Sequence, residues 1–594
     1  MCGIVGYTGK DKCIPKIISG LESLEYRGYD SAGVAYITKG IIEIKKEEGR
    51  IENLKNELDM EVSSTVGIGH TRWATHGKPS DENSHPHRVG KITLVHNGIV
   101  ENYNELRNVV GSYDYLSETD SEVVAALINK LYEEKQDMLE VLKELKNYLI
   151  GSYALGILVD GDDKIYTIRK DSPLIIGVAK DGNFIASDVP AILEYTNMYY
   201  LLLNDEFAVL NKDDVIIYDK NGNVVDKTLN TFEGGREAAM KNGYDHFMLK
   251  EIYEQPTVIM ETIGEYIRDI KHLNERMVGL EKYDAIDIIG CGSAYHVGLV
   301  GKSLITKYGE IPVYVDIASE YRYTEHIYSK KHLIILISQS GETADTLAVL
   351  RKAKEHGVDT LAIVNVVGSS IAREADKVLY IKAGPEIAVA TTKAYSCQLM
   401  MLSLIAMYLG IKKGNLNEGI LEEYDNLKEL IPEVLKDIKS LEKIAKKICK
   451  KKHIFYLGRK CDYALCMEAS LKLKEISYIH SEAYAAGELK HGTISLIEKG
   501  TPVISVITDD DIKYKTLSNV KEVCARGALS IIITNDSMMD PDIYDVMITI
   551  PKVHELVSPI LAIIKCQLIA YYVAKLNGCD IDKPRNLAKS VTVE

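Results

Sequence analysis

Several features of secreted, membrane-spanning and disulfide-bonded proteins are missing from this sequence. The first residues, MCGIVGYTGK, contain no basic leader and no long apolar stretch, so we expect no secretory signal. The most apolar run, 399–411, is interrupted by Ser403 and Tyr408 and is shorter than the roughly 20 residues that span a bilayer, which predicts a buried helix. The ten cysteines are scattered without CxxC pairs, so neither a zinc site nor a disulfide framework is expected. These absences favour a cytoplasmic protein.

Basic residues are also in the minority, since the formal net charge is −15. A nucleic-acid-binding protein usually carries a basic patch or stripe, so this balance argues against such a role. It does not exclude anionic substrates, because a few local cations can hold one phosphate. The length of 594 residues predicts three to five domains, at about 100–200 residues per domain.

The order of strand-like and helical patterns changes near residue 231. Before this point, short β-like runs are separated by turns that contain Gly and Asp, which predicts an α+β layered domain. These runs lie at 66–69, 91–95, 155–159 and 175–178, with a helical stretch at 121–133. We place this first domain at 2–225 and a polar, Gly-containing linker at 226–245.

Two similar α/β units follow the linker. Strand–helix–strand order recurs in both, which predicts two doubly wound parallel sheets. The strands are expected at 285–289, 333–337 and 360–364 in the first unit and at 454–457, 503–507 and 530–533 in the second. Gly458 follows Gly290 by 168 residues, as expected of a duplicated unit. We place these domains at 246–435 and 436–580, followed by a C-terminal tail at 581–594.

The two units differ at the end of their second strand. In the first, Ser338 opens the run Ser-Gln-Ser-Gly-Glu-Thr, whose hydroxyls and backbone N–H groups at a helix N-terminus suit a phosphate. In the second, Thr508 is followed by three aspartates, which would repel a phosphate. We therefore expect one phosphate site per chain, in the first unit. Helix capping explains a Ser/Thr-rich helix start equally well when that feature stands alone.

Cys2 follows the initiator methionine and is small enough to allow its removal. Processing would leave a cysteine with a free α-amine, whose reference pKa of about 7.7–8.0 suits a base. The thiol would then be a nucleophile with its base on the same residue. Many proteins begin with Met-Cys by chance, so this feature alone does not establish catalysis.

Four motifs strengthen the interpretation of Cys2. The chain contains CGIVGY at its start, HTRWATHG at 70–77, HNGI at 96–99 and SETD at 117–120. As a set, they resemble the N-terminal-nucleophile (Ntn), or class II, glutamine amidotransferases. The resemblance implies a glutaminase domain in which Cys2 attacks the glutamine amide, a thioester forms and ammonia leaves.

The roles known in that family can be carried over to the matching positions. Arg72 would hold the carboxylate of glutamine bidentately, and Asp120 would pair with its ammonium. Asn97 and the backbone amide of Gly98 would stabilise the oxyanion. Trp73 would gate the passage of ammonia, with simple packing as the alternative. Two further residues are expected to line the glutamine pocket, Thr75 and His76.

The second half contains three further motifs, LKLKEISY at 471–478, EAYAAGELKHG at 482–492 and NLAKSVTVE at 586–594. The duplicated α/β unit resembles sugar isomerase (SIS) domains, and the motifs resemble those of the glucosamine-6-phosphate synthases, the isomerizing glutamine–fructose-6-phosphate aminotransferases. With the glutaminase motifs, the resemblance extends over essentially the whole chain in the same order. It implies ammonia transfer from L-glutamine to D-fructose 6-phosphate and isomerisation to D-glucosamine 6-phosphate, at the start of hexosamine and UDP-N-acetylglucosamine biosynthesis.

Four residues of this half fit the conversion of a 2-ketose to a 2-amino aldose. His491 suits ring opening, because its reference pKa of about 6.5 serves both acid and base roles. Glu475 suits proton transfer from C1 to C2 if burial raises its pKa. Lys589 could form a Schiff base with the ketone. Lys472, on the same helix face as Glu475, could tune that carboxylate or move protons during imine formation. Taken singly, these residues would be a loop histidine, a solvated helix face and a tail lysine.

The contacts to the phosphosugar are predicted mainly from the first α/β unit. Family members commonly have Thr-Ser after the Gly-Cys-Gly turn, whereas this chain has Ser293 and Ala294, so one hydroxyl contact is in doubt. Val389, in the loop EIAVATTKA, is expected to form a wall of the site. The residues assigned to the sugar phosphate are Ser293, Ser338, Gln339, Ser340, Thr343 and Val389.

No metal and no organic cofactor is implied. The resemblance implies a homodimer in which His491 serves the neighbouring subunit, without a nucleic-acid or membrane partner. Three alternatives stay open: an amidotransferase with phosphoribosyl pyrophosphate or aspartate as acceptor, a phosphosugar deaminase or deglycase, and a non-catalytic sugar-phosphate sensor. The chain lacks the acidic diphosphosugar loop and the SGGxDS loop of the first alternative. The Cys2 motifs disfavour the second, because a deaminase has no need for glutamine. The joint presence of Glu475, His491 and Lys589 disfavours the third.

Overall fold

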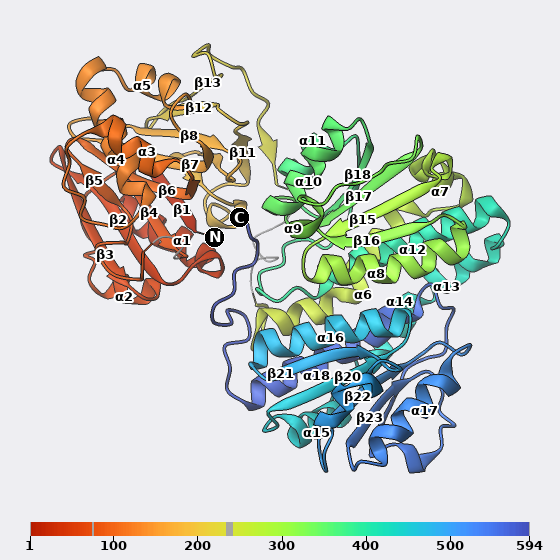
Figure 1. Cartoon of the computed structure of the whole chain (residues 1–594). Helices are drawn as coiled ribbons and strands as arrows, with labels where there is room; N and C mark the ends of the chain where they lie inside the picture. Colours follow the sequence, from red (N-terminus) through yellow and green to blue (C-terminus); the bar gives the residue numbers. More distant parts are fainter. Residues whose placement is uncertain (1, 74–76, 233–240, 593–594) are drawn as a thin grey trace. The chain divides into compact units, whose positions relative to one another are not determined.

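The computed structural model covers the whole chain and describes residues 2–73, 77–232 and 241–592. The chain divides into two compact units, Met1–Ala239 with Ala588–Glu594, and Met240–Leu587 (Figure 1). The boundary falls inside the stretch predicted as a linker. That stretch also includes a short strand, β14 (Asn230–Thr231), which pairs with a strand of the first unit.

The first unit is built on two antiparallel sheets. Their strand orders are β14-β11-β9-β10-β1-β4-β2-β3 and β13-β12-β8-β7-β6-β5. The first sheet comprises β14 with β1 (Gly3–Gly9), β2 (Ser31–Thr38), β3 (Ile41–Glu48), β4 (Val66–Arg72), β9 (Ile175–Ala179), β10 (Gly182–Ala186) and β11 (Met198–Leu201). The second sheet comprises β5 (His87–Val89), β6 (Ile92–Val100), β7 (Gly151–Val159), β8 (Ile165–Lys170), β12 (Phe207–Leu210) and β13 (Val215–Tyr218).

Helices cover these sheets and give the unit a layered α+β architecture, as predicted. The helices are α1 (Cys13–Leu24), α2 (Ile51–Asn56), α3 (Tyr103–Val110), α4 (Asp120–Lys135) and α5 (Met138–Leu145). Helix α1 packs on β1 and β4, and α4 packs on β6. Successive side chains of β6 enter different cores, because Val95 packs with Ile4 and Ile68 of the other sheet while Leu94 packs with Val123 of α4.

The second unit contains two parallel sheets of the same topology. Their orders are β16-β15-β17-β18-β19 and β21-β20-β22-β23-β24, which confirms the predicted duplication. The first sheet comprises β15 (Ala285–Gly290), β16 (Val313–Ile317), β17 (His332–Ser338), β18 (Asp359–Val364) and β19 (Lys377–Tyr380). The second comprises β20 (His453–Gly458), β21 (His480–Ala485), β22 (Pro502–Ile507), β23 (Leu529–Thr534) and β24 (Val546–Thr549).

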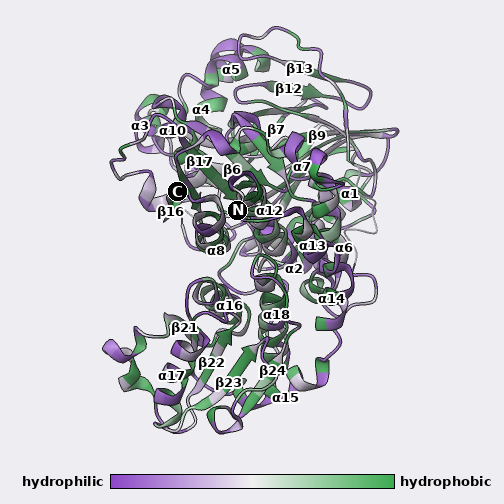
Figure 2. Cartoon of the chain, turned by 90° about the vertical axis from the view of Figure 1, so that its right-hand side faces the viewer, coloured by the Kyte–Doolittle hydropathy of each residue, from purple (hydrophilic) through white to green (hydrophobic). Residues whose placement is uncertain are grey.

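Helices join the two parallel sheets around a common core. The longer ones are α6 (Phe247–Tyr266), α8 (Ser293–Gly309), α10 (Ala344–Glu355), α12 (Lys393–Lys413), α15 (Ile438–Ile448), α16 (Cys461–Ser477), α17 (Lys513–Cys524) and α18 (Ser558–Leu576). The shorter ones are α7 (Ile270–Met277), α9 (Ala318–Tyr321), α11 (Ser370–Glu374), α13 (Leu421–Asp425) and α14 (Leu427–Val434). Helix α8 packs against α12 and α16, and α16 packs against α18. In Figure 2, strands β22 and β23 are coloured hydrophobic, whereas α5 shows hydrophilic colouring.

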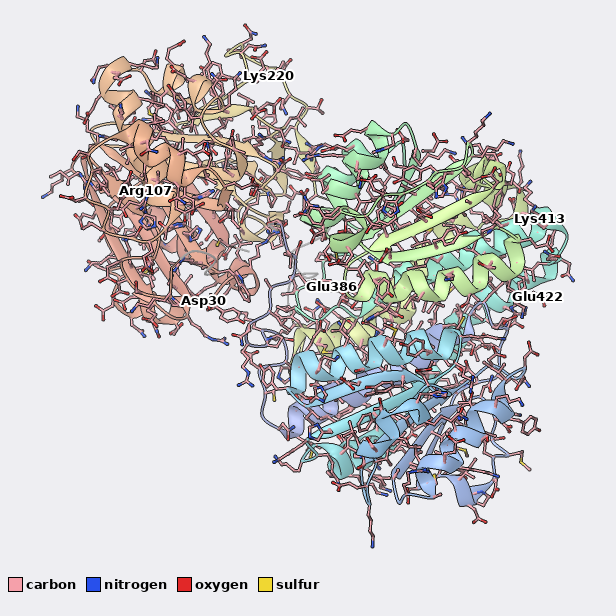
Figure 3. The ribbon with its side chains drawn as sticks, viewed as in Figure 1. Asp30, Arg107, Lys220, Glu386, Lys413 and Glu422 are labelled. Atoms are coloured by element: carbon pink, nitrogen blue, oxygen red, sulfur yellow. The ribbon has the colours of Figure 1, made fainter. Side chains whose placement is uncertain are left out.

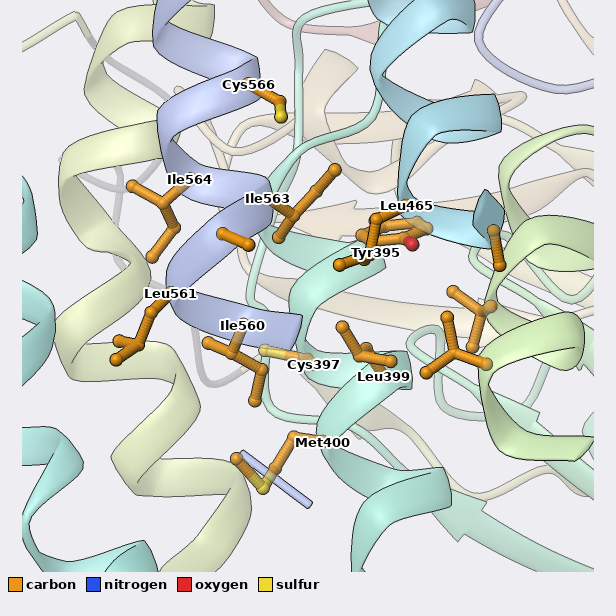
Figure 4. Packing of buried hydrophobic residues seen from close by; sticks show 14 of the residues in the cluster. Tyr395, Cys397, Leu399, Met400, Leu465, Ile560, Leu561, Ile563, Ile564 and Cys566 are labelled. Carbon is orange, nitrogen blue, oxygen red and sulfur yellow. The ribbon is translucent and has the colours of Figure 1, made fainter. Parts of the chain in front are cut away.

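The apolar run at 399–411 lies in α12, which is buried along nearly its whole length, as predicted. Helices α12 and α18 are long and apolar enough to cross a membrane by length and composition alone, yet 94% and 89% of their apolar windows are buried in the protein. Figure 4 shows Cys397 and Met400 of α12 in one packed cluster with Ile560 of α18. Their burial is that of core helices.

Candidate active sites

Cys2 lies directly before β1, among groups from two other strands. Strand β1 pairs antiparallel with β4, with Gly3 opposite Thr71, so the residue before Gly3 lies beside those that follow Thr71. The Trp73 N–H donates to Cys2 Sγ at 3.2 Å, and Asn97 Nδ2 donates to the Cys2 carbonyl at 2.8 Å. The fold therefore brings together three residues that lie far apart in the sequence.

The environment of Cys2 does not by itself produce a thiolate. Burial raises the pKa of the thiol, and the Trp73 N–H and the Arg72 guanidinium oppose this effect without overcoming it. A thiol with a raised pKa needs a base beside it to become a nucleophile near neutral pH. The α-amine expected on a processed Cys2 would be such a base.

Arg72 and Asp120 supply buried charges of opposite sign. Arg72 ends β4, is 3% exposed and donates to the carbonyls of Gly77 at 3.1 Å and Lys78 at 3.4 Å. Asp120 begins α4, is 4% exposed and accepts the N–H of Val100 at 2.8 Å. Such a pair can recognise the carboxylate and the ammonium of an amino acid.

Asn97 and Gly98 lie near the end of β6. Gly98 has a φ of +135°, and a Cβ at this position would lie 2.0 Å from the Ser152 carbonyl oxygen. Only glycine therefore fits there. The Asn97 amide carries two N–H donors, and one of them binds Cys2, so the second can serve an oxyanion.

Histidines to which the sequence assigns no role form a buried cluster with His70. His85 Nδ1 lies 3.0 Å from His70 Nε2, which lies 3.1 Å from Asn97 Oδ1. His87 Nε2 lies 3.1 Å from Thr119 Oγ1. Burial lowers the pKa of His70 to about 3 and the pKa values of His85 and His87 well below the ordinary value. Of these neutral rings, His70 contacts Asn97 directly and His85 contacts His70, and no sequence spacing reveals this proximity.

The remaining residues predicted for the glutamine site are only partly described. Trp73 is half-buried, and its ring meets that of Tyr29 edge-on, at a centroid distance of 6.1 Å and an angle of 88°. Thr75 and His76 lie outside the described residues.

The turn after β17 gathers four of the residues predicted to bind phosphate, Ser338, Gln339, Ser340 and Thr343. Ser338 Oγ lies 2.9 Å from Thr343 Oγ1 and accepts the Gly341 N–H at 3.0 Å. Gly341 has a φ of +66°, which favours glycine. Helix α10 begins directly after Thr343, so the turn presents its hydroxyls at a helix N-terminus, where an anion is stabilised.

A buried carboxylate absent from the sequence-based prediction, Glu468 of α16, links the two α/β folds. Its Oε1 accepts the Ser293 hydroxyl at 2.9 Å, and its Oε2 lies 2.9 Å from Nδ1 of His296. Both partners belong to α8, and Glu468 is fully buried. Ser293, expected at the phosphate, thus has an internal partner. The only sequence signal for Glu468 is its i−4 spacing from Lys472.

Lys472 lies between two carboxylates on one face of α16. Its Nζ is 2.6 Å from Glu475 Oε2 and 3.4 Å from Glu468 Oε1. Burial lowers the pKa of Lys472, but the charges of Glu475 and Glu468 outweigh that effect and leave the pKa raised. The Lys472 side chain is 1% exposed and that of Glu475 is 18% exposed. The Lys472 ammonium is therefore more deeply buried than the Glu475 side chain, which is partly exposed.

Val389 lies in the loop before α12. Glu386, labelled in Figure 3, lies in the same loop and binds two of its residues. The Glu386 carboxylate accepts the Thr391 hydroxyl at 2.7 Å and the Thr392 N–H at 2.9 Å. The Val389 N–H donates to the carbonyl of Asp582 at 3.0 Å. The predicted wall of the sugar site is thus fixed by hydrogen bonds at both of these points.

His491 and Lys589 are placed differently from the Lys472–Glu475 pair. His491 ends a short 3-10 turn after β21 and is exposed. Lys589 is half-buried in the C-terminal segment that groups with the first unit. Within the described part of the chain, the fold brings together Lys472 and Glu475, while His491 is a surface residue.

In the second α/β fold, an internal carboxylate occupies the strand end that corresponds to the phosphate turn. Asp462, 3% exposed, accepts the Thr508 N–H at 2.8 Å and the Thr508 hydroxyl at 2.5 Å. Burial raises the pKa of Asp462 to about 6. This carboxylate already uses the Thr508 N–H and hydroxyl donors that a phosphate at this strand end would need.

Comparison with known proteins identifies the domain types of this chain. The chain matches the family model described as SIS domain at residues 279–408 and 447–575, and that described as glutamine amidotransferase domain at 70–194. It is 51% identical to the glutamine–fructose-6-phosphate aminotransferase (isomerizing) of Clostridium tetani and 45% identical to that of Methanosarcina acetivorans, each over 100% of both chains.

A solved structure shows the same relationship for the second unit. The chain resembles the C-terminal domain of glucosamine-fructose-6-phosphate aminotransferase from Francisella tularensis, with 39% sequence identity and a TM-score of 0.55, over 58% of this chain and 99% of that one. Because the identity to the curated relatives extends over the full length, the chain belongs to the family of isomerizing glutamine–fructose-6-phosphate aminotransferases.

Proposed function

We propose that this chain makes glucosamine 6-phosphate by releasing ammonia at Cys2 and isomerising the aminated sugar at the Lys472–Glu475 pair. As a member of its family, it transfers ammonia from L-glutamine to D-fructose 6-phosphate and isomerises the product to D-glucosamine 6-phosphate, with L-glutamate as second product. The observation that carries the assignment of the sugar site is the buried Lys472 ammonium, 2.6 Å from Glu475.

In the glutaminase half, the Cys2 thiol attacks the side-chain carbonyl carbon of glutamine, and its proton passes to the α-amine. The oxyanion accepts hydrogen bonds from Asn97 Nδ2 and the Gly98 N–H. The C–N bond then breaks, the amine returns the proton to the leaving ammonia, and water hydrolyses the thioester to glutamate. The buried charges of Arg72 and Asp120 support their role in holding the amino-acid end of the substrate.

In the sugar half, His491 opens the ring by moving a proton from the C2 hydroxyl to the ring oxygen. The Lys589 amine condenses with the C2 ketone and releases water, and ammonia then displaces the lysine as the C2 imine forms. Glu475 takes a proton from C1 and delivers one to C2, while the C1 hydroxyl loses its proton and the imine nitrogen gains one, which converts the imine to the 2-amino aldose. Lys472 orients the Glu475 carboxylate through their 2.6 Å contact. The hydroxyls of the turn after β17 hold the phosphate.

The working form proposed for the enzyme is a cytoplasmic homodimer. His491 is exposed on its own chain, which supports the proposal that it serves the site of the neighbouring subunit. Trp73 is proposed to gate the ammonia, because ammonia released into water would be diluted and protonated.

A coupled assay tests this function. Purified protein receives glutamine and fructose 6-phosphate, and mass spectrometry measures glutamate and glucosamine 6-phosphate. We expect equal amounts of both, lost in Cys2→Ala and retained in Cys579→Ala, a half-buried cysteine of the other unit. Glutamate without glucosamine 6-phosphate would overturn the assigned acceptor but keep the glutaminase.

A further inference from the structure

The C-terminal segment is fixed to α6 shortly after it leaves α18. Asp582, 7% exposed, accepts the N–H groups of Phe247 and Met248 at 2.9 Å each. These are the first two residues of α6, whose backbone N–H groups have no partner within the helix, so the carboxylate satisfies both and complements the helix dipole. The Asp582 carbonyl also accepts the Val389 N–H from the loop before α12.

A second point of attachment lies directly after α16. The Tyr478 hydroxyl accepts the backbone N–H of Arg585 at 2.8 Å, and the Arg585 guanidinium carbon lies 4.2 Å from the centroid of the Tyr478 ring. That distance lies within the range of a cation–π interaction. Tyr478 ends α16 in the left-handed conformation, with a φ of +60°, so its direction is set by the helix that carries Glu475.

These contacts limit how far Lys589 can move. A chain spans at most about 3.6 Å per residue, so Lys589 lies within about 14 Å of Arg585, four residues earlier. If the contact with Tyr478 were lost, Asp582 would be the nearest remaining anchor, and Lys589 could then lie up to about 25 Å from it. Tyr478 itself is only three residues beyond Glu475.

We propose that Tyr478 and Asp582 are positioning residues that hold the C-terminal segment so that Lys589 meets the sugar at the site of Glu475. Neither residue touches the substrate in this scheme. Asp582 binds the start of the segment to the loop that contains Val389. Tyr478 binds the segment at Arg585 to α16, the helix that carries Lys472 and Glu475. The proposal rests on the Schiff-base role proposed for Lys589.

Two variants separate the contribution of the Tyr478 hydroxyl from that of its ring and leave the backbone conformation unchanged. Tyr478→Phe removes the hydroxyl alone, whereas Tyr478→Asn removes the ring as well and still tolerates the left-handed conformation. Tyr514→Asn is the matched control, because Tyr514 is exposed on α17 with Lys513 Nζ 5.3 Å from its ring centroid. It removes a similar ring–cation contact elsewhere in the same unit.

The readout is the covalent adduct on Lys589. Full-length protein is incubated with fructose 6-phosphate, reduced with borohydride and analysed by peptide mass spectrometry, in parallel with the coupled assay. Because misplacement by about 1 Å can cost a hundredfold in rate, we expect Tyr478→Asn to lower adduct formation and synthesis about tenfold or more. Glutaminase activity and melting temperature should match those of the Tyr514→Asn control. Adding Arg585→Ala to Tyr478→Asn should cause little further loss, because Tyr478→Asn already removes the ring that the Arg585 guanidinium contacts.

Two outcomes separate this proposal from the function on which it rests. If the Tyr478→Asn and Asp582→Asn variants both form the adduct at the wild-type rate, the positioning role is wrong. If the wild-type protein forms no adduct on Lys589, the Schiff-base role is wrong before any variant is considered. Should Tyr478→Asn reduce the melting temperature, Tyr478→Phe and Arg585→Ala, the latter at an exposed side chain, remove the hydroxyl–backbone hydrogen bond and the guanidinium–ring contact one at a time.

Discussion

The Ser293 hydroxyl donates a hydrogen bond to Glu468 Oε1 at 2.9 Å, across 175 residues of sequence. The first residue begins α8, close to the Gly-Cys-Gly turn, and the second lies on α16, one helical turn before Lys472. One buried carboxylate thus joins the fold that carries the phosphate turn to the helix that carries the proton-transfer pair. Loss of the Glu468 charge should therefore lower the pKa of Lys472.

Glu468→Gln should lower synthesis about tenfold or more, because it removes one of the two charges that raise the pKa of Lys472. The ion pairs of Lys472 stabilise the protein below the lysine's ordinary pKa and are lost only as the pH rises through the raised value. In Glu468→Gln that loss should occur at lower pH. The measurement is the pH profile of synthesis together with the melting temperature across the alkaline range.

Glu433→Gln, on an exposed residue of α14, is the control for Glu468→Gln. An unchanged alkaline limb in Glu468→Gln would show that Glu468 does not act through Lys472. We expect the unfolding free energy of Glu468→Gln to fall by about 1–3 kcal/mol, since buried partners lose a charged acceptor.

Asn97→Ala should lower the rate of glutamine hydrolysis by about 10²–10³, the usual cost of removing one oxyanion donor. The KM for glutamine should change little, because the donor acts mainly in the transition state. Glutamate release measures both. Asn223→Ala, at an exposed turn, should have no effect, and an Asn97→Ala protein with wild-type turnover would remove Asn97 from the oxyanion site.

Asp462 should make the stability of the second α/β fold depend on pH. Its native pKa of about 6 lies above the ordinary 3.8, so the folded form holds a proton that the unfolded chain releases between these values. Stability should therefore fall as the pH rises from about 4 to about 6, by about 3 kcal/mol, and Asp462→Asn should abolish this slope. Thermal unfolding across that range checks it. Asp511→Asn is the control, and the same slope in Asp462→Asn would contradict the assignment.

Removal of residues 587–594 should abolish synthesis and spare much of the glutaminase. The deletion takes away Lys589 but leaves Asp582 and Arg585, so the base of the segment keeps its anchors. Parallel measurement of glutamate and glucosamine 6-phosphate gives the result. Retained synthesis would contradict a catalytic role for the tail.

Mixing two inactive proteins tests whether His491 acts on the neighbouring subunit. Glu475→Gln and His491→Ala chains, allowed to exchange subunits, should recover part of the synthesis, since a mixed dimer contains one intact composite site. As the control, each variant is taken through the same exchange procedure alone. Absence of recovery, with exchange demonstrated by native mass spectrometry, would argue against a shared site.

Local patterns were sufficient to predict much of this protein. Buried strands alternating with helices predicted the two α/β folds, because parallel strands need helical crossovers. The i,i+3 spacing of Lys472 and Glu475 predicted a shared helix face, and their 2.6 Å contact confirms it. The motifs around Cys2 predicted the glutaminase, because its chemistry requires particular residue types within short segments.

Other features were decided by tertiary structure alone. Glu468 meets Ser293 and Asp582 meets α6 only because separate helices and segments pack together, and such contacts leave no periodic signal in the sequence. His85 and His87 have the appearance of loop residues, yet the fold buries them beside His70 and makes them neutral. A sequence determines which faces are apolar and which residues can react, whereas the distances between remote polar groups follow from how those faces pack.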